Sequence, residues 1–322
     1  MLARPEATER RTPDGKRGGR RFNVTSKNRA NLTGWAFAAP GMLVLMIMMV
    51  IPILTVLYDS FFVNIYATTS ERTFVGFENF RSLVEDDFFW SAASNTAIVV
   101  VFRVILTLGV GLMLAIALNQ PFNPRVRGVI RSVVMLPWLL ASSVVAAIGV
   151  LILAPLGIVN STLSTLGIAV GNQPWLGQTS TALWAVILWS VWRGFPFVFV
   201  MLLAGLQSVP RDLLEAALVD GARPSQRLRY VTLPHLRGVI FVVALLETIW
   251  TMRLFDLVYV MTGGGPLGST HVLATMIYEI SFRDLEFGRA SAAAIVLLVL
   301  SLIVAVLYLW LERRGDRGQA VI

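Results

Sequence analysis

The sequence contains no cysteine, only two histidines and only two lysines among its 322 residues. Without thiols, the chain can form no disulfide, no cysteine-ligated zinc or iron–sulfur site, and no thiol nucleophile. The two histidines, His235 and His271, are widely separated in the sequence and cannot form a histidine-rich metal site. Carboxylates could still bind a cation, but we expect no metal and no cofactor in this chain.

A phosphate-binding loop is also missing. Both lysines, Lys16 and Lys27, lie within the first 30 residues, and no Gly-x-x-x-x-Gly-Lys-Ser/Thr segment occurs. The glycine-rich segment 263–266 has no lysine and is interpreted as a turn. No Ser/His/Asp set or paired-histidine zinc spacing appears, which weakens a membrane-embedded enzyme without removing it. We expect the chain not to be an enzyme, and any ATP hydrolysis to belong to a separate polypeptide.

Charged residues are scarce. They make up 14% of the chain, against about 25% in soluble domains, whereas hydrophobic residues make up 56% and the mean hydropathy is +0.71. A membrane span needs about 20 apolar residues. The sequence predicts an all-α, polytopic membrane protein with six transmembrane helices. They are placed at about 34–58, 94–118, 132–155, 181–206, 237–261 and 288–311.

The net charge of +8 would suggest a nucleic-acid partner in a soluble protein, but here the positions of the charges matter more. Most of the 27 basic residues lie in the segments before the first span, after the second, after the fourth and after the sixth. The positive-inside rule then places both termini in the cytoplasm, and no nucleic acid is expected. Residues 1–33 are predicted to be a disordered basic tail, 34–311 the membrane domain, and 312–322 a second cytoplasmic tail.

The cytoplasmic segment 207–236 contains a predicted short helix. Pro210 suits its first turn, and the carboxylates of Asp212 and Glu215 suit the positive end of its dipole. Gly221 suits a left-handed residue after its last turn. The leucines and alanines between them form a narrow apolar stripe that could fit a groove on another protein. A plain amphipathic connector is the alternative.

The spacing of this segment resembles a known family. Glu215-Ala216-Ala217 is followed after three residues by Gly221 and after nine more by Val231-Thr232-Leu233-Pro234, which resembles the EAA loop of ABC importer permeases. The likeness extends over about 35–311 and is greatest to the carbohydrate-uptake branch, the maltose/glycerol-3-phosphate-like first permease subunit. Its other matching segments are 192–197, 203–207, 255–256, 262–266, Thr270 and 287–292.

This resemblance implies a multi-pass subunit of the bacterial cytoplasmic (inner) membrane, embedded in lipid. Its partners would be a second homologous permease, two cytoplasmic ATPase subunits and an external solute-binding protein. The solute would be a sugar, an oligosaccharide or a polyol derivative. The residues implied in coupling to the ATPase are Glu215, Ala216, Ala217, Asp220 and Gly221.

Placing an ionisable residue inside a membrane span costs free energy, so such residues tend to face a cavity or a partner. A sugar site needs hydrogen-bonding groups and a flat apolar ring, and two predicted helices present both on one face each. In relatives of known structure, the same two faces line the sugar site. The predicted pathway residues are Ser190, Arg193, Gly194 and Phe197 on the fourth helix, and Glu247, Trp250 and Thr251 on the fifth.

Two alternatives stay open for these groups. Arg193 and Glu247 could form a structural ion pair with each other instead of binding substrate. An ion-coupled secondary transporter could use Arg193, Glu247 and Asp256 as a proton relay. Arg253 and Asp256 are expected to pair within one helix or with the second permease, Arg103 has no assigned role, and Pro196 is expected to kink the fourth helix.

Overall fold

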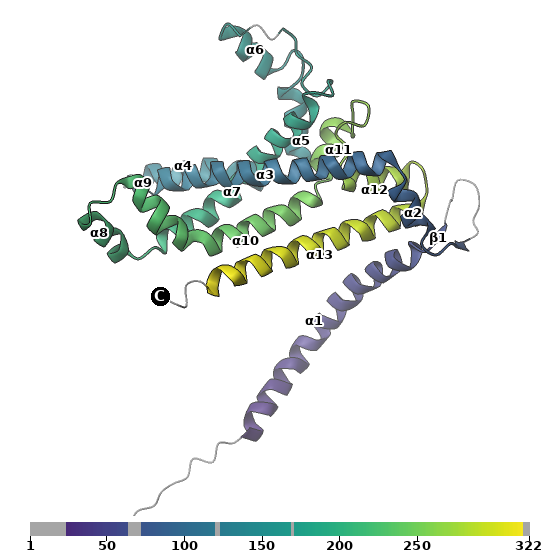
Figure 1. Cartoon of the computed structure of the whole chain (residues 1–322), viewed down its shortest axis with the longest axis horizontal. Helices are drawn as coiled ribbons and strands as arrows, with labels where there is room; N and C mark the ends of the chain where they lie inside the picture. Colours follow the sequence, from purple (N-terminus) through teal and green to yellow (C-terminus); the bar gives the residue numbers. More distant parts are fainter. Residues whose placement is uncertain (1–23, 64–71, 120–122, 169–170, 318–322) are drawn as a thin grey trace, which may run out of the picture. The chain divides into compact units, whose positions relative to one another are not determined.

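The computed structural model describes residues 24–63, 72–119, 123–168 and 171–317, and most of these are helical (Figure 1). In this described part, five helices are long and apolar enough to cross a membrane, or six if one bent pair counts as a single span. The chain is therefore an all-α polytopic membrane protein, as the sequence predicts. The long helices are α1 (Val24–Asp59), α3 (Asp87–Leu118), α7 (Ala182–Gln207), α10 (Leu233–Met252) and α13 (Phe287–Arg317).

Shorter elements connect them. In chain order they are β1 (Phe62–Val63), β2 (Thr73–Phe74), α2 (Glu78–Val84), α4 (Pro124–Leu139), α5 (Ser142–Ile152), α6 (Ile158–Thr165), α8 (Arg211–Val219), α9 (Pro224–Arg227), the π-helix η1 (Leu228–Thr232), α11 (Asp256–Thr262) and α12 (Leu273–Phe282).

The chain divides into two units, Met1–Leu54 and Thr55–Ile322. The first contains most of α1, whose apolar stretch runs over Phe37–Asp59. Helix α1 begins at Val24, so residues 24–33, predicted as part of a disordered tail, are helical. The rest of that predicted tail, and residues 318–322 of the other one, lie outside the described residues.

The second unit is built on α3 and α7, which pack along much of their length (Figure 1). Small residues let them approach: a Cβ atom added to Gly111 of α3 would lie 2.7 Å from Val198 Cγ1 of α7. Val198, Phe199 and Leu202 are completely buried here. Helix α10 packs against both helices, and α13 packs against α10.

The predicted third span, 132–155, is wrong as a single helix. Instead α4 and α5 meet at an angle of 97°. Leu140 and Ala141 between them have extended backbones, with ψ of 146° and 142°. Pro137 in the last turn of α4 removes a helical hydrogen-bond donor just before this elbow. Helix α5 is tied to α7 by the Trp189 indole, which donates to the Val145 carbonyl at 2.7 Å.

The predicted fifth span, 237–261, also divides. Helix α10 ends at Met252, and α11 begins at Asp256. Arg253 and Asp256 are therefore on either side of a break, and the expected pairing within one helix is wrong. By contrast, Pro196 does not interrupt α7, which runs continuously from Ala182 to Gln207.

The described residues between α1 and α3 form a small folded connection. Strands β1 and β2 pair antiparallel, with Phe62 opposite Phe74. The Asn79 amide donates to the carbonyls of Ser60 and Phe62. Gly288, in the first turn of α13, packs so closely that an added Cβ would lie 1.9 Å from the Phe62 oxygen. This end of the second unit is thereby fixed to the start of α13.

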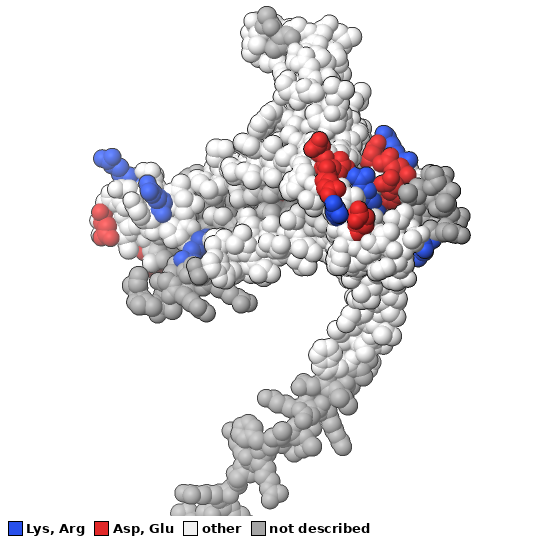
Figure 2. Space-filling view, turned by 45° about the vertical axis from the view of Figure 1, so that its right-hand side comes forward, with Lys and Arg blue, Asp and Glu red and all other residues white. Residues whose placement is uncertain are grey.

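Charged side chains gather at two places on the face drawn in Figure 2, and the surface between them is almost free of charge. Many exposed side chains of the long helices are large and apolar, for example Ile105 and Met113 on α3 and Ile303 and Val306 on α13. Such an uncharged belt between polar ends is what a bilayer requires of a spanning bundle.

Candidate functional site

A cavity of about 390 Å³ lies where α3, α7 and α10 meet the two helix breaks. Its wall combines three arginines, two carboxylates, a hydroxyl and several aromatic rings. The lining residues are Arg103, Trp138, Ser142, Arg193, Gly194, Glu247, Trp250, Arg253, Leu254, Phe255 and Asp256.

A buried ion pair forms one side of this cavity. Arg103 Nη2 of α3 lies 3.1 Å from Glu247 Oε2 of α10, and the two side chains are only 5% and 1% exposed. Arg103 Nη1 also donates to Thr251 Oγ1 at 2.5 Å, and the Thr251 hydroxyl donates to the Glu247 carbonyl at 2.5 Å. These bonds hold both charges in one position. The partner of Glu247 is thus Arg103, and the structural pairing of Glu247 with Arg193 is wrong.

Gly194 of α7 makes room for this pair. A Cβ atom added there would lie 3.0 Å from Arg103 Nη2, 3.2 Å from Thr107 Cγ2 and 3.5 Å from Glu247 Oε2. Contacts of 3.0 to 3.2 Å are tighter than carbon packing tolerates without a shift of the neighbours. The glycine is therefore part of the geometry of the site.

Arg193, one residue earlier on α7, differs from Arg103. Its side chain is half-buried and lines the cavity, and its Nε has no hydrogen-bond partner. Across the described ranges, no carboxylate lies within ion-pairing distance of its guanidinium. Arg253 and Asp256 are exposed at the rim of the same cavity and form no ion pair with each other. A continuous proton relay through Arg193, Glu247 and Asp256 is not formed.

Aromatic rings form another part of the wall. Phe197 of α7 stacks on Trp138 of α4 at 5.8 Å between ring centroids, with 18° between the planes. Phe197 also contacts Trp250 of α10 edge-on, with 4.9 Å between the ring centroids. Both tryptophans line the cavity, and Phe197 lies between them as their packing partner. Flat apolar surfaces are therefore present beside the polar groups.

The predicted pathway residues divide between the wall and its support. Arg193, Gly194, Glu247 and Trp250 line the cavity, whereas Ser190, Phe197 and Thr251 do not. The buried Ser190 hydroxyl donates to the Ile187 carbonyl of its own helix at 2.7 Å. Sequence reasoning gave no role to Arg103, although an isolated arginine inside a predicted span was a usable signal. It also missed four lining residues at the helix breaks, Trp138, Ser142, Leu254 and Phe255, and it did not place Arg253 and Asp256 in a sugar site.

The predicted coupling residues lie on and just after α8. None of the residues of this helix is buried. Glu215, Ala216 and Asp220 are exposed, Ala217 is half-buried, and Leu218 and Val219 are exposed apolar side chains.

The end of α8 has the predicted left-handed glycine. Gly221 has φ of +74°, its N–H donates to the Leu218 carbonyl at 3.0 Å, and the Ala222 N–H donates to the Ala217 carbonyl at 2.9 Å. This double pattern is a Schellman ending. It turns the chain sharply from α8 towards α9.

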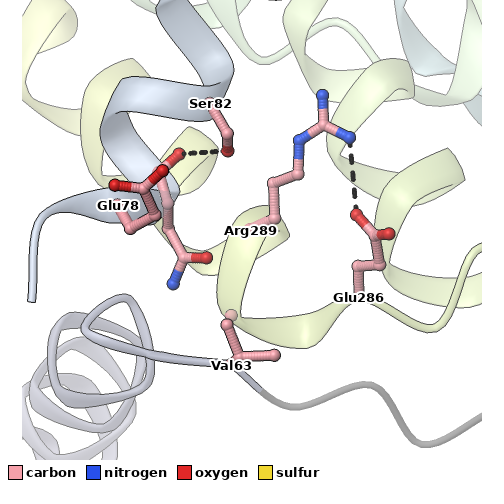
Figure 3. A pocket seen from close by; sticks show the side chains of 7 residues that line it. Val63, Glu78, Ser82, Glu286 and Arg289 are labelled. Atoms are coloured by element: carbon pink, nitrogen blue, oxygen red, sulfur yellow. Dashed lines mark hydrogen bonds and ion pairs between the residues drawn. The ribbon is translucent and has the colours of Figure 1, made fainter. Parts of the chain in front are cut away.

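A second hollow, of about 310 Å³, lies at the opposite end of the unit, between α2 and the start of α13 (Figure 3). Arg289 pairs there with Asp86 and, at 3.4 Å, with Glu286. Glu78 and Ser82 of α2 line the same hollow. Among the described residues, no group of three or more histidine or acidic side chains is placed to hold a metal.

Known proteins resemble this chain over most of its length. The family described as "Binding-protein-dependent transport system inner membrane component" matches residues 107–317. The sulfoquinovosyl glycerol transport system permease protein SmoG of Agrobacterium fabrum is 35% identical over 279 residues, covering 86% of this chain and 89% of that protein. The trehalose/maltose transport system permease protein MalF of Thermococcus litoralis is 33% identical over 297 residues, covering 90% of this chain and 98% of that protein.

Among solved structures, a bacterial ABC transporter for the import of the acidic polysaccharide alginate contains a similar fold. The TM-score is 0.78 at 22% sequence identity, over 90% of this chain and 98% of that one. A second structure with the same TM-score is that of a bacterial alginate ABC transporter in complex with a periplasmic protein bound to an alginate pentasaccharide.

Proposed function

Because this chain belongs to the family of inner-membrane components of binding-protein-dependent transport systems, we propose that it is the permease subunit of an ATP-driven importer for a sugar or a sugar derivative. It performs no chemistry and provides part of the route through the bacterial cytoplasmic membrane. The names of both relatives refer to sugar-containing solutes, which supports this class of substrate.

The cavity between α3, α7 and α10 is proposed as the position of the sugar during transport. Its volume of about 390 Å³ falls in the range of small-molecule sites, about 300–1,000 Å³. Trp138 and Trp250 offer flat surfaces for the C–H faces of a sugar ring, and Arg193 offers hydrogen-bond donors. Glu247 and Arg103 would hold the helices in register around it.

The exposed helix α8 is the observation that carries the proposal of ATP-driven transport. A cytoplasmic helix with no buried residue, exposed apolar side chains and a rigid glycine ending is suited to a groove on another protein. We assign that groove to an ATPase subunit, because this chain has no phosphate-binding loop. Two such subunits would serve this permease and a second, homologous one that completes the pore.

At the opposite end, we propose that the surface around α2 and the start of α13 meets the external binding protein. Charged side chains of both signs lie there, because Arg289 pairs with Asp86 and Glu286. Such mixed charge is suited to a partner that binds and leaves.

The coupling assignment is tested by site-specific cross-linking. Since the chain has no cysteine, a cysteine introduced at Ala216 would be its only thiol. The importer is purified as a complex and treated with a bifunctional maleimide. We expect Ala216→Cys to give a cross-linked product that contains the ATPase. The matched control, Phe74→Cys on exposed β2, should give none. Equal products from both variants would contradict the assignment.

A further inference from the structure

We propose that the sugar moved through this cavity carries an acidic group and that the Arg193 guanidinium pairs with that group. The inference rests on the proposed transport function and narrows its substrate to an acidic sugar, one that bears a carboxylate, a sulfonate or a phosphate ester. It begins from the charges in the cavity wall, which are three arginines and two carboxylates.

The Arg103–Glu247 pair neutralises itself. Its two atoms are 3.1 Å apart, both side chains are almost fully buried, and Thr251 accepts a further hydrogen bond from the arginine. The geometry therefore removes one positive and one negative charge from those available to a ligand. Arg193, Arg253 and Asp256 remain, with a net charge of +1.

Of these three, Arg193 is the one withdrawn from water. It is half-buried, whereas Arg253 and Asp256 are exposed at the rim. Its Nε is completely covered and makes no hydrogen bond, and no acidic side chain of the described chain pairs with it. An unpaired charge inside a membrane protein is strongly unfavourable, so such groups have partners in the working state. A sugar hydroxyl would leave this charge uncompensated, whereas an anion would neutralise it.

The shape of the guanidinium and its surroundings favour an anion too. Arginine presents its donors as a planar fork that matches the paired oxygens of a carboxylate, sulfonate or phosphate. Ser142, the first residue of the 11-residue helix α5, also lines the cavity. The positive end of that helix dipole therefore lies at the same wall, where an anion is stabilised. The indole of Trp250 beside it would contact the apolar face of the sugar.

Arg193 could instead pair with a carboxylate of the second permease. The following transport experiment distinguishes an acidic solute from such a carboxylate. The complete importer, with its second permease, ATPase and binding protein, is reconstituted in liposomes. Uptake is measured for radiolabelled pairs that differ by one acidic group: glucose and glucuronate, glycerol and glycerol 3-phosphate, maltose and maltobionate. The variants are Arg193→Gln, Arg193→Lys and the matched control Arg125→Gln, which removes an exposed arginine on α4 away from the cavity.

We expect the wild-type importer to take up the acidic member of at least one pair. Arg193→Gln should reduce that uptake at least tenfold, because a charge-assisted hydrogen bond is lost. Arg193→Lys keeps the positive charge but not the planar guanidinium, so its uptake of the acidic solute should lie between that of Arg193→Gln and that of the wild type. Uptake by Arg125→Gln should match the wild type. The second permease should co-purify equally with every variant.

Four results would overturn the inference. The first is uptake of the neutral solutes only, and the second is uptake of an acidic solute that is unchanged in Arg193→Gln. Both would leave the proposed function as a sugar importer intact. Loss of the second permease from the Arg193→Gln complex would show that Arg193 pairs with that subunit. A complex that hydrolyses ATP and moves no member of any pair would contradict the proposed function itself, and the inference with it.

Discussion

Arg103 and Glu247 show how a membrane protein holds two charges away from water. Each charge is tolerated because the other lies 3.1 Å away, so removing one leaves an isolated buried charge. We predict that Glu247→Gln or Arg103→Met alone destabilises the chain by about 3–5 kcal/mol, and that the double variant loses less than either. The measurement is the thermal unfolding midpoint in detergent.

Arg193→Gln is the matched control for this pair, because it removes an arginine that has no carboxylate partner in the described chain. Arg193→Gln should shift the unfolding midpoint less than Glu247→Gln or Arg103→Met does. Strictly additive losses in the double variant would show that Arg103 and Glu247 do not depend on each other.

Gly194 carries a second prediction at the scale of one residue. Gly194→Ala places a methyl group 3.0 Å from Arg103 Nη2 and should destabilise the chain by about 1–3 kcal/mol, because the buried pair cannot move aside freely. Gly109→Ala on α3 is the control, since nothing lies within 4 Å of the added atom. The measurement is again the thermal unfolding midpoint in detergent, compared between the two variants. Equal shifts for both glycines would rule out a packing role for Gly194.

Among the elements, α8 has the most direct mutational test. We predict that Gly221→Ala adds about 1 kcal/mol of strain, because φ of +74° is unfavourable for a residue with a Cβ atom. Glu215→Ala changes only an exposed carboxylate of the helix. Both variants should insert normally but co-purify with less ATPase and support less uptake, since they alter the docking element and not the core.

The control is Gly128→Ala in α4, where an added Cβ also meets nothing and φ is not positive. Normal uptake and full ATPase recovery from both Gly221→Ala and Glu215→Ala would remove α8 from the coupling role.

Helix breaks explain where the cavity is. Trp138 and Ser142 lie on either side of the α4–α5 elbow, and Arg253 and Asp256 lie on either side of the α10–α11 break. In an unbroken helix, the backbone would fix the directions of these side chains around the helix axis. Such a helix would also have no terminus inside the bundle. Interrupted helices in membrane proteins bring such ends to bound solutes. The two breaks therefore supply half of the charged and hydroxyl side chains in the cavity wall, namely Ser142, Arg253 and Asp256.

At the scale of the whole molecule, the prediction concerns what the chain does alone. The purified subunit should hydrolyse no ATP, because it has no phosphate-binding loop and both of its lysines precede the membrane domain. Phosphate release by the subunit in liposomes is compared with release by the complex with its ATPase. Turnover by the isolated subunit that persists after further purification would contradict the division of labour proposed above.

Much of the fold could be predicted from the sequence, because burial in lipid imposes long apolar helices and few charges. The long apolar runs predict the spans that correspond to α1, α3, α7 and α13, and a single glycine predicts the ending of α8. The two breaks were not predicted correctly. The apolar pattern predicts one helix over 132–155, whereas the chain bends at Leu140–Ala141, because an apolar run reads the same in a straight helix and in a bent one.

The sequence by itself determined the class of protein, most of the membrane helices and the position of helix α8, because these depend on composition and on spacing along one element. Only the tertiary structure decided which charges meet. Periodicity put Glu247 on one face of a helix, but its partner came from α3, 144 positions earlier in the chain, and not from the arginine on the helix expected beside it. Ion pairs form through space at distances of a few ångströms, so the choice between Arg103 and Arg193 depended on how three helices pack.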